Sequence, residues 1–137
     1  MLKPLHALLL ACAVALTGCA ASGDPADDSP LVVDSDGGTW TAEVTVRATG
    51  TGWVEVPMTL TDAEGAATGL AIESDVFMPA HGHGSSERIT TTELEGEPGV
   101  YNVSAFFTMP GEWEITSRVD PEGLDEAVVF TVEALSE

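Results

Sequence analysis

The residues most able to do chemistry in this sequence are histidines and methionines gathered in two short segments. The run MPAHGHG at residues 78–84 contains Met78, His81 and His83, and the chain has no other histidine after residue 18. A second Met-Pro segment, TMPG, contains Met109. Thioether sulfur selects Cu(I), and imidazole suits either oxidation state of copper. The sequence therefore predicts a copper cofactor, Cu(I) or Cu(II), with Met78, His81, His83 and Met109 as candidate ligands.

The local spacing agrees with such a site but leaves a structural alternative open. In an extended His-x-His segment both rings lie on one side, and Gly82 and Gly84 let the backbone bend so that both can reach one ion. Zinc is served less well, because neither cysteine is expected to remain as a thiol, although acidic side chains could complete a tetrahedral site. In the alternative, each methionine belongs to the core in phase with its strand. The histidines would then be exposed in a Gly-rich loop.

These two segments resemble the YtkA-like (FixH-related) domain family. Members of that family show a Met-Pro-x-Met-x-His loop, then Gly-x-Tyr, then a Met-x-Gly-x-Trp turn. In this chain MPAHGHG is followed by GVYNVSAFFTMPGEWEI at residues 99–115. The resemblance extends over about residues 40–132. The matching positions are Met78, His83, Gly99, Tyr101, Met109, Gly111 and Trp113.

The resemblance implies an exported or membrane-attached, β-rich domain that handles copper or supports cytochrome oxidase assembly. His81 stands where many members have a second methionine, so the site would be a mixed Met/His site that tolerates Cu(II). Trp113, Tyr101 and Gly111 would support the site structurally. In particular, the two aromatic side chains would pack in the core and set the distance between the two Met-Pro loops.

Alternating apolar and polar residues predict strands through the rest of the chain. Turn signals recur about every ten residues, and no helical period follows the N-terminal apolar run. The predicted fold class is all-β, a small antiparallel immunoglobulin-like β-sandwich of about seven strands, with a compact barrel as the alternative. The expected strands are residues 40–47, 54–60, 70–78, 88–94, 100–108, 112–119 and 127–133.

The N-terminal residues predict an exported lipoprotein. Lys3 precedes an apolar run at residues 7–16, which is too short to span a bilayer and is typical of a signal peptide. The run ends in LTGC, which resembles the bacterial lipobox, so cleavage is expected before Cys19 and lipidation on its sulfur. The expected domains are a lipoprotein signal peptide at 1–18, a lipidated cysteine with a flexible acidic tether at 19–38, and a YtkA-like β-sandwich at 39–137.

The charge of the cleaved chain excludes some partners. It would keep three arginines against 23 acidic residues, a formal charge of 3 − 23 = −20. Nucleic acid is not expected as a partner, because no basic patch could neutralise phosphates. Membrane attachment would depend on acyl chains such as palmitate rather than on charge. With Cys12 removed and Cys19 acylated, neither a disulfide nor thiol chemistry is expected.

These observations lead us to expect a membrane-tethered periplasmic copper-binding module rather than an enzyme, because the cleaved chain has no free thiol, no lysine and no nucleophile elbow. The expected partners are the membrane and, through copper delivery, a membrane copper protein or oxidase. Ala20 after the cysteine favours the outer membrane over the inner one in a cell that has both. The alternative is a structural or protein-interaction β-sandwich lipoprotein without a metal. The sequence leaves the oligomeric state open.

Overall fold

The computed structural model describes residues 29–137, which form an all-β domain of eleven strands. The predicted signal peptide, Cys19 and the tether up to residue 28 lie outside the described residues. In chain order the strands are β1 (Leu31–Asp34), β2 (Thr41–Val44), β3 (Ala48–Thr49), β4 (Gly52–Asp62), β5 (Gly65–Ala66), β6 (Ile72–Met78), β7 (His83–Gly84), β8 (Thr90–Glu93), β9 (Val100–Phe107), β10 (Gly111–Val119) and β11 (Glu126–Ala134).

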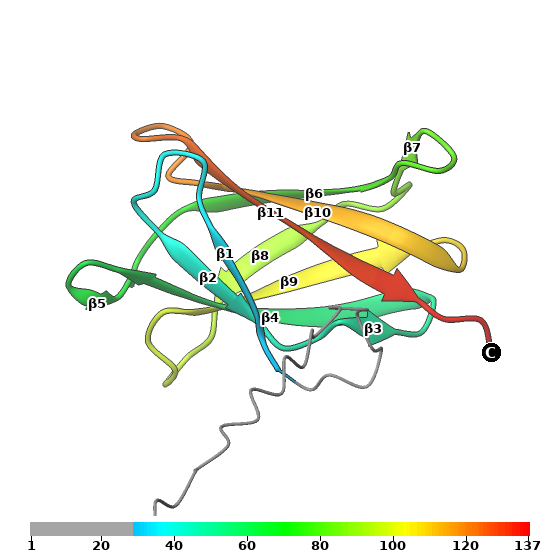
Figure 1. The fold of residues 1–137 in the computed structure, drawn as a ribbon, viewed down its shortest axis with the longest axis horizontal. Coiled ribbons are helices and arrows are strands. Elements are labelled where there is room, and N and C mark those ends of the chain that lie inside the picture. The colour runs from blue at the N-terminus through cyan, green and yellow to red at the C-terminus, as the bar shows by residue number, and fades with distance from the viewer. Residues whose placement is uncertain (1–28) are drawn as a thin grey trace, which may run out of the picture.

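The strands form two sheets that lie face to face (Figure 1). One sheet has the order β1-β2-β4-β9-β8, with β5 paired to β4, and the other has the order β3-β11-β10-β6-β7. Among these described strands, every pair is antiparallel except β3 with β11. The prediction of an all-β sandwich is therefore confirmed.

All seven expected strands occur, and the additional ones are β1, β3, β5 and β7. These four have two to four residues each. The three two-residue strands are too short to show a period of two, and the sequence of β1, LVVD, does not alternate between apolar and polar residues. The omission matters at β7, which consists of His83 and Gly84 and belongs to the candidate site.

The core lies between the sheets and is built from their inward-facing side chains. Side chains on β9 alternate between buried and half-buried along the whole strand, as expected for a strand with one face in the core. The largest fully buried side chains include Trp113, Tyr101, Phe107, Met58 and Met78. This close-packed core sets the positions of the loops at both ends of the sandwich.

The folded domain begins earlier than the sequence indicated. β1 pairs with β2 in a continuous register from Leu31 opposite Val44 to Asp34 opposite Thr41. The expected domain boundary at residue 39 is therefore wrong, and residues 31–38 belong to the sandwich rather than to a tether.

A carboxylate from the far end of the chain holds this N-terminal segment in place. Glu126 accepts hydrogen bonds from Ser35 Oγ at 2.6 Å and from the Thr39 amide at 3.0 Å. The Ser35 hydroxyl, and after it the Thr39 hydroxyl, lower the pKa of Glu126. Because Ser35 and Glu126 are 91 residues apart in sequence, the local composition of the N-terminal segment does not indicate this contact.

The two ends of the sandwich bear different loops (Figure 1). We call one the hairpin end, which bears the β6–β7 turn at residues 79–82 and the β9–β10 turn at residues 108–110. We call the other the tyrosine end, which bears the β5–β6 connection at residues 67–71 and the β8–β9 turn at residues 94–99. β9 runs from the tyrosine end to the hairpin end.

Candidate metal site

The segment richest in candidate ligands is a tight hairpin between β6 and β7. The amides of His81 and Gly82 donate to the Met78 carbonyl at 3.3 and 2.9 Å, and Gly82 has φ of 65°, a left-handed conformation that favours glycine. The register pairs Met78 directly with His83. Directly opposed residues of an antiparallel pair place their side chains on the same face of the sheet. The fold therefore brings Met78 and His83 side by side.

Met78 lies inside the protein rather than at its surface. Its side chain is 1% exposed, and its Cε lies 3.0 Å from the point that a Cβ at position 111 would occupy. Gly111 also has φ of 136°, which L side chains rarely adopt. Glycine at this position therefore leaves room for the Met78 thioether at the start of β10.

Trp113 connects the hairpin to the second Met-Pro turn. Its indole is fully buried and stacks on Phe107 with a centroid distance of 5.3 Å. The Nε1–H group donates to the carbonyl of Met109 at 3.0 Å, and the ring meets the His83 imidazole edge-on at 5.8 Å. One side chain thus contacts a residue of each predicted ligand segment and sets the relation between them.

The two imidazoles lie close together but in different surroundings. Their ring centroids are 6.0 Å apart. His83 is half-buried, and its Nδ1 lies 3.1 Å from the Gly84 carbonyl oxygen. His81 is exposed on the turn. Since a metal ion binds imidazole nitrogen at about 2 Å, a gap of this size suits one ion shared by both rings.

The remaining donors come from sulfur rather than from carboxylates. Within residues 29–137, no three side chains of His, Cys, Asp or Glu gather closely enough to hold a metal ion. Met109 is partly buried and packs against the core next to the hairpin end. Met78 and the two histidines supply nitrogen and thioether donors, the combination that suits copper. Met109 is linked to them through its backbone carbonyl and Trp113.

Tyr101 does not belong to this site, so its predicted role in spacing the Met-Pro loops is wrong. It lies six residues before Phe107 on β9, which corresponds to about 20 Å along an extended strand. Its hydroxyl donates to the Ala67 carbonyl at 2.8 Å and accepts from the Leu70 amide at 3.1 Å. Burial raises the pKa of Tyr101. The residue locks the β5–β6 connection at the tyrosine end.

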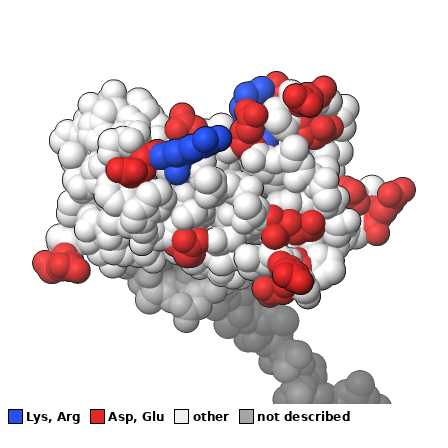
Figure 2. Space-filling model, turned by 180° about the vertical axis from the view of Figure 1, so that it is seen from behind, with Lys and Arg blue, Asp and Glu red and all other residues white. Residues whose placement is uncertain are grey.

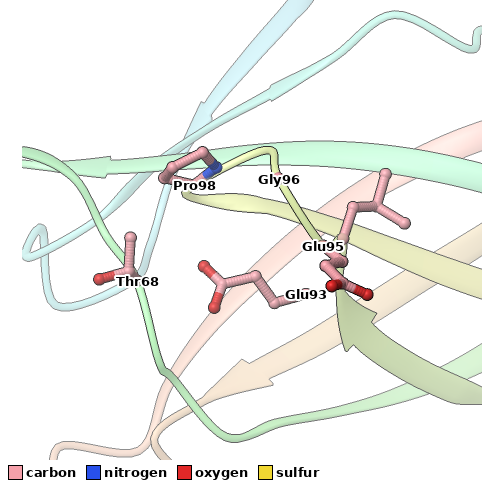
Figure 3. A pocket seen from close by; sticks show the side chains of 6 residues that line it. Thr68, Glu93, Glu95, Gly96 and Pro98 are labelled. Carbon is pink, nitrogen blue, oxygen red and sulfur yellow. The ribbon is translucent and has the colours of Figure 1, made fainter.

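A pocket at the tyrosine end holds acidic side chains but has a structural explanation (Figure 3). The Glu93 carboxylate accepts hydrogen bonds from the Gly99 amide at 3.0 Å and the Gly69 amide at 3.1 Å. These two bonds, with that from Gly99 the larger cause, lower the pKa of Glu93. Its oxygens are therefore committed to holding two loops together. The pocket is lined by Thr68, Glu93, Leu94, Glu95, Gly96 and Pro98.

The surface agrees with the acidic composition of the chain. Figure 2 shows acidic side chains scattered over one side of the domain, with few basic ones among them. Arg118 is already paired with Asp125 at 2.9 Å and with Glu73 at 3.3 Å. In the part of the chain that the structure describes, no helix is long and apolar enough to cross a membrane.

The sequence alone indicated the two Met-Pro segments and the histidines, but it missed the carboxylates that hold the loops. Glu93 and Glu126 stand among 23 acidic residues and have no distinguishing local motif. Their partners lie in other segments of the chain. No pattern within a short stretch could have separated them from the solvated acids.

Comparison with known proteins supports one assignment. No curated protein matches the chain. A solved structure described as ZirS C-terminal Domain is similar at 11% identity and a TM-score of 0.42, covering 99% of this chain and 88% of the other. An identity and a TM-score this low do not support an assignment. The model of the YtkA-like family matches residues 39–118, more than half of the chain and the whole of the candidate site. The protein therefore belongs to the YtkA-like family.

Proposed function

We propose that this protein is a membrane-tethered, periplasm-facing copper-binding module. Met78, His83, His81 and Met109 are its proposed ligands. The task that follows from a tethered copper site is delivery of copper to a membrane copper protein, such as an oxidase during assembly.

The observation that carries this proposal is the register of the β6–β7 hairpin. It pairs Met78 with His83 directly across the two strands, and Trp113 contacts the His83 imidazole while donating to the Met109 carbonyl. Residues 26 or more positions apart in sequence thus meet at one end of the sandwich. A loop without a binding role does not require two histidines and two methionines in one small region.

The donor types favour copper over other metals. Thioethers bind Cu(I) well, and hard cations such as Mg²⁺ or Ca²⁺ require oxygen ligands. Zinc sites in proteins use thiolate, imidazole or carboxylate rather than thioether. With Met78 buried and His83 half-buried, the site would shield Cu(I) from water on the side of the core.

A metal-free role in protein interaction is the second candidate, and exposed aromatic side chains favour it. Trp53 is 55% exposed and lies 5.2 Å from Phe106, directly across the strand pair. Phe77, on β6, is 41% exposed. Since β4 begins opposite Phe107, these side chains surround the hairpin end. A partner could dock there with or without copper.

A copper titration of the full-length lipoprotein in detergent micelles tests the proposal. Because the His83 ring lies 5.8 Å from Trp113, Cu(II) bound by His83 should quench the fluorescence of that indole. Trp53→Phe removes the exposed indole and leaves the buried ones to report. Cu(I) binding is measured separately by competition with a coloured chelator. We expect one copper ion per chain in both titrations.

Ligand variants make this experiment decisive. The double variant His81→Asn, His83→Asn should lose Cu(II) quenching and weaken Cu(I) binding, whereas Ser86→Ala, an exposed change beside the hairpin, should bind like the parent. Unaltered binding in the double variant would refute these ligands. Absence of stoichiometric binding in the parent would refute the copper function and leave the interaction role.

The membrane tether is proposed from the lipobox-like LTGC motif at residues 16–19. Changing Cys19 to Ser would remove the sulfur that accepts the lipid, so the variant should leave the membrane fraction. If it floats with membranes as the parent does, attachment does not depend on this cysteine.

A further inference from the structure

His83 is held in one orientation by contacts with β6, with β10 and with its own strand, β7. It is paired across the strands with Met78, its ring packs edge-on against the buried Trp113, and its Nδ1 lies 3.1 Å from the Gly84 carbonyl oxygen. A carbonyl can only accept a hydrogen bond, so this contact places the proton on Nδ1 and leaves the lone pair on Nε2. The ring therefore presents one fixed donor atom.

His81 differs from His83 in every one of these respects. It is exposed at the tip of the turn, next to Gly82. Within residues 29–137 its ring contacts His83 and makes no hydrogen bond. Exposed side chains change rotamer in picoseconds to nanoseconds. The His81 ring can therefore move toward or away from the shared gap without disturbing the core.

The site also has few potential ligands on its solvent side. No carboxylate, thiol or third imidazole of the described chain joins the two rings. An ion held by Met78 and His83 would consequently keep an accessible side, and the exposed His81 ring lies 6.0 Å from the His83 ring. Incoming ligands from another molecule must approach through this side, because Trp113 and Phe107 fill the interior behind the site.

We propose that the two histidines have different roles, which rests on the copper-binding function proposed above. His83 is the fixed ligand that sets affinity, and His81 is the exchange ligand through which copper enters and leaves. During capture, His81 binds the ion while it is still attached to the donor and passes it to His83 and Met78. During release the order is reversed. Copper keeps its oxidation state throughout, and one coordinate bond forms as another breaks.

This division of roles predicts an unusual effect of removing His81: the release of copper should become slower rather than faster. A residue that acts only as a ligand stabilises the loaded state, so its removal speeds release. A residue that stabilises the intermediate of exchange lowers the barrier in both directions, so its removal slows capture and release together. The affinity then changes little, because both rates change by the same factor.

The experiment uses the full-length lipoprotein in detergent micelles. Release of Cu(I) is followed by stopped flow after adding bathocuproinedisulfonate, and capture is followed by mixing the apo protein with the Cu(I)–acetonitrile complex. Equilibrium competition with the same chelator measures Kd. The variants are His81→Asn, His83→Asn and the control Ser86→Ala, and thermal unfolding of each variant shows that it is folded.

For His81→Asn we expect capture and release both slowed about tenfold, with Kd changed less than about threefold. For His83→Asn we expect Kd weakened about 100-fold, chiefly through faster release. The Ser86→Ala control should match the parent in both rates.

Two results would overturn the inference while leaving the copper site intact. Faster release with weaker affinity in His81→Asn would make His81 an ordinary ligand, and unchanged rates would make it a bystander. Failure of the parent to bind Cu(I) at all would refute both this inference and the proposed function, and the equilibrium competition distinguishes that case from the others.

Discussion

The hairpin end and the tyrosine end of the sandwich use the same device with different results. At each end a fully buried aromatic side chain donates a hydrogen bond to a loop carbonyl, from Trp113 to Met109 at 3.0 Å and from Tyr101 to Ala67 at 2.8 Å. At the tyrosine end the Glu93 carboxylate is used by the scaffold as well, because it accepts hydrogen bonds from the Gly69 and Gly99 amides. That end is closed by its own backbone.

At the hairpin end most of the imidazole nitrogens of His81 and His83 have no hydrogen-bond partner within the described residues. The backbone engages only one nitrogen of His83, and the His81 ring makes no hydrogen bond within the described residues. The Met78 sulfur is buried beside Gly111. The difference agrees with the binding role proposed for the hairpin end, since loop residues not used by the scaffold are the ones that remain for ligands.

The largest effect is expected when Trp113, the buried aromatic residue of the hairpin end, is replaced. Trp113→Ala should lower the free energy of unfolding by about 3–5 kcal/mol, because it deletes a large buried side chain. Chemical denaturation measures this loss. Trp113→Phe is the sharper variant, because it keeps a buried ring and removes the bond to Met109. Copper affinity should fall in Trp113→Phe by more than its stability predicts; equal affinity would mean that the Met109 turn needs no anchor.

The corresponding change at the tyrosine end should separate stability from binding. Tyr101→Phe removes one hydroxyl and leaves the Ala67 carbonyl and Leu70 amide without it. Loss of a buried partner of this kind costs about 1–3 kcal/mol. Copper affinity should stay unchanged, because the site lies about 20 Å away along the strand. A copper defect in this variant would show that the two ends are coupled.

The smallest expected effect is a loss of folding stability at acidic pH. Hydrogen bonds from the Gly99 and Gly69 amides lower the pKa of Glu93 from its ordinary 4.5. The Glu93 carboxylate is therefore protonated at a higher pH in the unfolded chain than in the folded one. The contribution to stability is fully present above pH 4.5 and is lost as the pH falls through the lowered value. Melting temperatures of the metal-free protein should decline below this pH, and less steeply in Glu93→Gln. An identical slope would exclude Glu93 as a contributor.

The sequence was most informative where chemistry and periodicity are local. Alternation along strands such as β9 indicated the all-β sandwich, because a strand with one buried face must alternate. The Met-Pro turns and the His-x-His run were visible because each lies within a few residues. The segment at 31–38 was misassigned, because its partner Glu126 lies at the other end of the chain.

The candidate site divides in the same way. The sequence by itself determined which donors exist, since after residue 18 it contains two histidines and three methionines. Only the tertiary structure decided which of them meet. The β6–β7 register pairs Met78 with His83, packing puts Trp113 against that imidazole, and six residues of strand put Tyr101 at the opposite end. The physical reason is that residue type sets donor chemistry, whereas register and core packing act between segments far apart in sequence.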